Sequence, residues 1–117
     1  MANPEIPESL AELEQTLAGI EQVLDIPSLR EHAAALEEEA SAPDLWDDQA
    51  NAQRVTSELS LAQSDIRRIE ALRRRLDDLV ALVELAEGED DEDSWAEAAT
   101  DLVALKAAIG EMEVRTL

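Results

Sequence analysis

The sequence contains no cysteine, phenylalanine or tyrosine, and Trp46 and Trp95 are its only large aromatic residues. Without cysteine, the chain can form neither a disulfide nor a thiolate metal site. His32 is the only histidine, and no nucleophile is arranged with it, so a general-base or metal-binding role is poorly supported. Three scattered glycines cannot form a phosphate-binding loop. We therefore expect no enzyme activity, no catalytic residue, no cofactor and no metal.

Basic residues are also scarce. Nine Lys and Arg stand against 29 Asp and Glu, which gives a formal net charge of −20. Such a field repels nucleic acids, because their binding needs basic side chains, and it disfavours an anionic membrane surface. No apolar run has the length of a membrane span, and the first residues lack the features of a signal peptide. We expect a cytoplasmic protein that binds neither membranes nor nucleic acid directly.

The apolar residues that are present, mainly Leu, Ala, Val and Ile, recur at three- and four-residue steps. This spacing is typical of amphipathic helices, and the few turn residues argue against a β fold. We predict an all-α protein, an antiparallel helical bundle or coiled coil of three to four helices around one long central helix. The predicted helices span about 8–25, 27–41, 48–87 and 91–116, after a lead-in of residues 1–7, and residues 8–117 form a single domain.

Prolines and acidic residues predict where these helices begin and end. Pro27 predicts a break near Asp25, whose carboxylate can cap the following helix. Pro43 ends the second helix, and Asp47 or Asp48 can cap the third. Gly88 is the predicted end of the long helix. The acidic run 89–93 lacks the spacing of a calcium loop, so we interpret it as favourable charge at a helix N-terminus.

The apolar stripe of the long helix contains one irregular step. From Ile69 to Leu72 to Leu76 the spacing is three and then four, where a strict heptad would give the reverse. The extra three-residue step overwinds the seam locally or turns it toward a different neighbour. The last stripe continues to Val114 and Leu117 without a stop signal, so we expect the chain to be a fragment of a longer protein.

Two groups of residues are candidates for partner contacts. The first is a basic cluster on the long helix, made of Arg67, Arg68, Arg73, Arg74 and Arg75. It is either a contact for phosphate or an acidic partner, or a solvated face paired with the Glu-rich flanks of the second and fourth helices. The second group is the two tryptophans. We expect Trp46 and Trp95 to be buried structural anchors at helix starts, although an exposed, partner-binding tryptophan remains an alternative.

Several segments together resemble a known family. They are Ala42-Pro43-Asp44-Leu45-Trp46-Asp47-Asp48, the helix start Gln49-Ala50-Asn51-Ala52-Gln53-Arg54-Val55, the later Trp95-Ala96-Glu97-Ala98, and the closing Glu111-Met112-Glu113-Val114-Arg115. In this order they are similar to the N-terminal helical domain of the bacterial peptide chain release factor 2 family. The resemblance covers essentially the whole chain, and its most specific element is residues 43–46.

The resemblance implies a role in translation termination. Members of that family recognise the stop codons UGA and UAA and trigger hydrolysis of peptidyl-tRNA on the ribosome. Their codon-reading tripeptide and Gly-Gly-Gln motif are absent here, so no catalytic residue is carried over. The resemblance implies instead a monomeric docking domain that faces the stalk base of the large ribosomal subunit and the GTPase release factor 3. The alternative is a stand-alone acidic helical adaptor or coiled-coil scaffold, which uses the same stripes for partner binding or self-association.

Overall fold

The computed structural model describes residues 5–117, and within them every regular element is a helix. The order is α1 (Glu5–Leu24), α2 (Ile26–Ala40), the short 3-10 helix η1 (Leu45–Asp47), α3 (Gln49–Glu89) and α4 (Glu92–Thr116). The prediction of an all-α fold with one long helix is confirmed, since α3 alone has 41 residues. None of the described helices combines the length and the apolar character needed to cross a membrane.

The helices form two compact units, and the boundary between them falls inside α3. We call Leu24–Ile69 the helical hairpin. The residues up to Val23 and Glu70–Leu117 together form the three-helix unit. The boundary between Ile69 and Glu70 coincides with the irregular Ile69–Leu72–Leu76 step. Before this step α3 packs against α2, and after it α3 packs against α1 and α4, so the step marks a change of neighbour.

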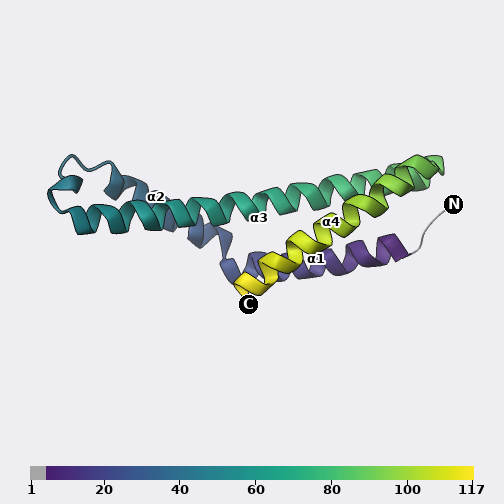
Figure 1. Ribbon diagram of the computed structural model, residues 1–117, viewed down its shortest axis with the longest axis horizontal. Helices are drawn as coiled ribbons and strands as arrows, with labels where there is room; N and C mark the ends of the chain where they lie inside the picture. Colours follow the sequence, from purple (N-terminus) through teal and green to yellow (C-terminus); the bar gives the residue numbers. More distant parts are fainter. Residues whose placement is uncertain (1–4) are drawn as a thin grey trace. The chain divides into compact units, whose positions relative to one another are not determined.

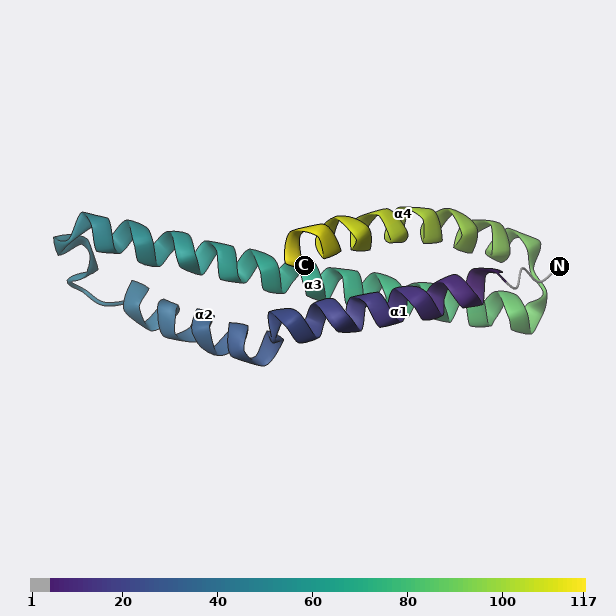
Figure 2. The same ribbon diagram turned by 90° about the horizontal axis from the view of Figure 1, so that it is seen from below.

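The helical hairpin consists of α2 running antiparallel to the first half of α3 (Figures 1 and 2). Its start is the break that Pro27 predicts: Asp25 adopts a left-handed conformation, with φ 51°, and its carboxylate accepts a 2.8 Å hydrogen bond from Ser28 Oγ. A 3.0 Å hydrogen bond from Gln63 Nε2 to Glu37 Oε1 joins the two helices. The apolar cluster between them consists of Leu36, Leu45, Ala52 and Val55, with Ala40 and Leu59 at its edge.

The three-helix unit packs α1 and α4 against the second half of α3, and both neighbours run antiparallel to it (Figure 2). Each helix contributes an apolar stripe, as the heptad-like spacing predicts. The buried apolar side chains are Ile6, Leu10, Leu13, Leu17 and Ile20 of α1, Leu72, Leu76, Leu79, Val83 and Ala86 of α3, and Trp95, Ala98, Leu105, Ile109 and Met112 of α4.

Two helix ends differ from the sequence-based prediction. The lead-in was expected to reach residue 7, but α1 begins at Glu5 and buries Ile6, while residues 1–4 lie outside the described part. Pro7 does not prevent this, because amides of the first helical turn have no partner within the helix. The second difference is at the C-terminal end of α3, which was expected at Gly88. The helix continues through Gly88 to Glu89. Asp90, with φ 50°, takes the left-handed conformation that was expected of the glycine.

Candidate interaction site

Arg73 lies in an ion-pair network between two helices of the three-helix unit. Its Nη2 donates a 2.5 Å hydrogen bond to Glu21 Oε1, and its Nε donates one of 3.2 Å to Glu21 Oε2. Its Nη1 lies 2.6 Å from Glu14 Oε2 and 2.8 Å from Oε1. Glu14 and Glu21 are two helical turns apart on α1, so one guanidinium joins both turns to α3.

The environment of Arg73 determines the charge state of its guanidinium and its availability to a partner. Only 26% of its side chain is exposed, and the hydrogen bonds that it donates to Glu21 raise the pKa of the guanidinium above its ordinary value, with Glu14 adding to the effect. Arg73 is therefore a permanently charged residue whose guanidinium is bonded to two carboxylates of α1. Few of its N–H groups are left to bind a phosphate. The expectation that the basic cluster pairs with the second and fourth helices is wrong at this residue, because the helix opposite Arg73 is α1.

The other four arginines of the cluster are exposed. Arg67 and Arg68 belong to the hairpin, and Arg74 and Arg75 belong to the three-helix unit. Their role as a partner contact stays a prediction. The sequence alone did not single out Glu14 and Glu21, although their seven-residue spacing beside the apolar stripe of α1 places both on one helix flank.

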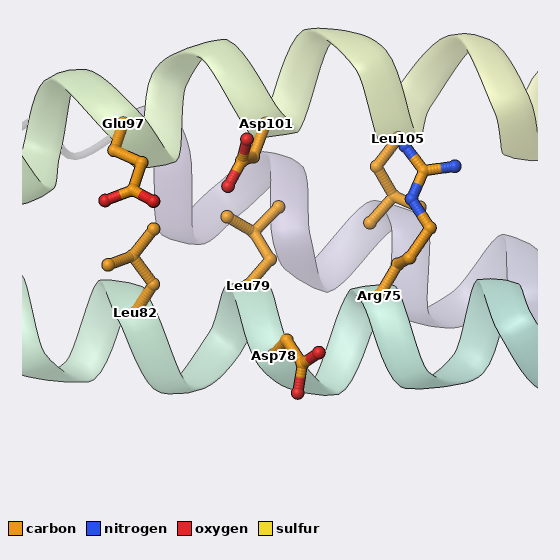
Figure 3. Close-up of a pocket in the computed structure, with 7 residues that line it drawn as sticks. All are labelled: Arg75, Asp78, Leu79, Leu82, Glu97, Asp101 and Leu105. Carbon is orange, nitrogen blue, oxygen red and sulfur yellow. The ribbon is translucent and has the colours of Figure 1, made fainter.

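Arg75 borders a groove of about 350 Å³ between α3 and α4. The groove is lined by Arg75, Asp78, Leu79, Leu82, Glu97, Asp101 and Leu105 (Figure 3). Figure 3 shows Arg75 reaching toward α4, while Glu97 and Asp101 project from α4 over the leucines. Three carboxylates outnumber the guanidinium, so a nucleic-acid phosphate would be repelled here. Among the described residues, no group of three or more His, Cys, Asp or Glu side chains could hold a metal ion.

The turn between α2 and α3 corrects the prediction of a buried Trp46. Trp46 is 60% exposed, whereas its neighbour Leu45 is 6% exposed and belongs to the hairpin cluster. The two side chains are adjacent on a short 3-10 turn, where they must point in different directions. Leu45 packs in the cluster with Ala52 and Val55, and the indole is left at the surface.

The backbone around Trp46 is held by short-range hydrogen bonds. The Leu45 amide donates to the Ala42 carbonyl, and the Asp47 amide donates to the Asp44 carbonyl, both at 3.1 Å. Asp48 then caps α3, because its Oδ1 accepts a 3.1 Å hydrogen bond from the Asn51 amide. The exposed indole thus stands on a well-bonded turn.

Trp95 lies in the opposite environment, at the start of α4. It is 6% exposed, and its Nε1 is the buried side-chain polar atom for which the described residues provide no hydrogen-bond partner. The acidic run before it supplies the helix cap: Asp91 accepts hydrogen bonds of 3.0 Å from the Asp93 amide and from Ser94 Oγ. His32, by contrast, lies exposed on α2.

Comparison with known proteins shows one consistent relationship. The PCRF domain matches residues 29–117. Peptide chain release factor 2 of Acidothermus cellulolyticus is 56% identical over 110 residues, covering 94% of this chain and 30% of that protein. The protein of the same name from Streptomyces avermitilis is 53% identical, over 100% of this chain and 32% of its own length. The Mycobacterium avium protein is 56% identical, over 97% of this chain and 31% of its own length. The chain therefore spans about a third of the length of these curated relatives.

Proposed function

This chain belongs to the PCRF domain family, and on that premise we propose that it is the N-terminal helical domain of a class I translation release factor that acts at UGA and UAA codons. The observation that carries the proposal is the identity of 53% with the Streptomyces avermitilis release factor 2 over the whole chain. Identity at this level extends over both helical units rather than over a single motif.

We propose that the chain contributes binding surfaces to termination and no chemistry. A Gly-Gly-Gln motif is absent from its sequence. The partner is the ribosome, at the stalk base of the large subunit, and the GTPase release factor 3 is a second partner. The net charge of −20 supports contacts with protein rather than with RNA. In this proposal the domain acts in termination in the cytoplasm, and it is monomeric.

A chimera tests this function directly. Residues 1–117 replace the matching segment of the Acidothermus cellulolyticus release factor 2, and peptide release is measured on ribosomes programmed with UGA, UAA or UAG. We expect release at UGA and UAA comparable to that of the intact factor. A control chimera carries an unrelated acidic helical domain in the same place. Release by the test chimera no faster than by this control would contradict the proposal.

An acidic helical adaptor is the second candidate, and one observation favours it. Val103, Val114 and Leu117 of α4 and the chain end are largely exposed, although they are apolar. Such side chains are typical of a helix that meets a partner or a second copy. Light scattering separates the two functions: a stable dimer at micromolar concentration supports the adaptor, and a monomer supports the release-factor domain.

A further inference from the structure

Trp46 combines three properties that are typical of a binding anchor. It is large and 60% exposed, and it stands on a turn whose backbone is fixed by the 3.1 Å bonds at Leu45 and Asp47. Burial of Leu45 in the hairpin core holds the same turn from beneath. The backbone that carries the indole therefore loses little conformational freedom when the side chain binds, which favours tight contact.

Acidic residues flank Trp46 on the turn between α2 and α3. Asp44, Asp47 and Asp48 lie within the same turn and are exposed. Together with Glu39 they line a surface recess beside the turn. The nearby cation, Arg54, is already engaged, since it lies 3.8 Å from Glu39 and 3.2 Å from Glu58. An exposed apolar ring with acidic neighbours is complementary to an apolar pocket with a basic rim.

We propose that Trp46 is the anchor with which this domain docks on the ribosome, and that it enters an apolar pocket of a basic ribosomal protein. Asp44 and Asp47 then face lysine and arginine side chains at the rim of that pocket. The inference rests on the proposed function and specifies the residue and the chemical kind of the ribosomal surface. Tryptophans of this kind carry a large share of the binding energy of protein interfaces, while rim charges mainly steer association.

Ribosomal RNA is the competing surface, and the charges of the turn argue against it. An exposed indole can stack on an unpaired base, but proteins that use such stacking combine it with a positively charged groove along the phosphates. The turn around Trp46 offers carboxylates in those positions, which repel phosphates. A protein pocket is therefore the surface that fits both the ring and the charges.

The test measures binding of the 117-residue chain to purified ribosomes by cosedimentation at several salt concentrations. Trp46→Ala should weaken binding at least about 30-fold, the effect of losing one hot-spot residue. The matched control is Leu61→Ala, also in the hairpin and 66% exposed, which should leave binding unchanged. Asp44→Asn with Asp47→Asn should weaken binding mainly at low salt. Circular dichroism of each variant verifies that the helices remain.

The outcomes separate the inference from the function on which it rests. Ribosome binding that Trp46→Ala leaves intact would overturn the anchor while the release-factor role stands. Trp46-dependent binding to protein-free ribosomal RNA would overturn the basic protein pocket. A wild-type chain that does not bind ribosomes would overturn the docking role and the anchor together, and peptide release by the chimera would show whether the release-factor assignment survives.

Discussion

The helical hairpin and the three-helix unit share one helix, α3, but the apolar side chains that they bury differ in size. Among the described residues, three of the seven buried apolar side chains of the hairpin are alanines, against two of fifteen in the three-helix unit. A long interhelical ion-pair network at Arg73 joins α1 to α3 in the larger unit, whereas Arg54 makes only exposed contacts in the hairpin.

This difference concerns a chain whose core, in the part that the structure describes, is aliphatic apart from Trp95. Three helices can enclose many leucine and isoleucine side chains, whereas two helices enclose fewer of them and use smaller residues such as Ala52 at the contact. The hairpin should therefore open locally more often than the three-helix unit. The hairpin also presents the exposed Trp46. The unit that we expect to be less stable therefore carries the residue that we propose as the ribosome contact.

The largest effect that tests this comparison comes from core truncation. Leu76→Ala, at a fully buried site of the three-helix unit, should lower the free energy of unfolding by about 3–5 kcal/mol, because the surrounding helices cannot close around the cavity. The matched change in the hairpin is Leu36→Ala, which should cost nearer 2 kcal/mol. Urea denaturation followed by circular dichroism measures both. Equal losses would show that the hairpin is packed as tightly as its neighbour.

The two arginine sites provide the next contrast. Arg73→Ala should cost about 1–2 kcal/mol, since it removes charge-assisted bonds from a mostly buried guanidinium, with a reduction for the exposed Glu14. Arg54→Ala and Arg74→Ala, both at exposed sites, should change stability by less than about 0.5 kcal/mol. Thermal melts at low and high salt provide the measurement. A loss at Arg74 equal to that at Arg73 would contradict the assignment of the network to Arg73.

Helix caps should contribute similarly in the two units. Asp91→Ala removes two 3.0 Å bonds at the start of α4, and Asp48→Ala removes one of 3.1 Å at the start of α3. Each change should cost about 1 kcal/mol, the usual value of an N-cap. The corresponding Asn variants serve as controls, because asparagine retains one acceptor oxygen for the bond from the backbone amide. Stability that stays unchanged in Asp91→Ala would show that the acidic run does not need a specific cap.

A small effect in the stabilising direction concerns Gly88, which lies inside α3 with open space around an added methyl group. Gly88→Ala should stabilise the chain by roughly 0.5–1 kcal/mol, because alanine favours helix and restricts the unfolded state. The melting temperature in a thermal scan is the readout. Destabilisation would indicate that the end of α3 requires a backbone conformation that glycine adopts more readily than alanine.

Much of the fold follows from apolar spacing. The stripes predict the four helices and nearly all buried positions, and Pro27 predicts the break between α1 and α2. The irregular step at Ile69 predicts either local overwinding or a change of neighbour, and the neighbour does change at the boundary of the units. These features are periodic or local, so a sequence contains the information they need.

The candidate site was harder to predict, because it depends on which elements face each other. A 3-10 turn has no long periodicity, so the sequence did not show that Leu45 rather than Trp46 faces inward. The partners of Arg73 lie more than fifty positions earlier in the chain, on a helix that only the antiparallel packing brings opposite. Gly88 was a reasonable helix end by residue type, but α3 runs one residue further to Glu89, and Asp90 takes the left-handed conformation.

The contrast between the two tryptophans has an optical consequence. With no tyrosine or phenylalanine in the chain, all intrinsic fluorescence excited in the near ultraviolet arises from Trp46 in the hairpin and Trp95 in the three-helix unit. One indole is solvated and the other is enclosed by aliphatic side chains, so their emission maxima should be separated. Single-tryptophan variants, Trp46→Phe and Trp95→Phe, would each report one unit. The opening of the hairpin and the melting of the larger unit could then be followed separately, without attaching a dye.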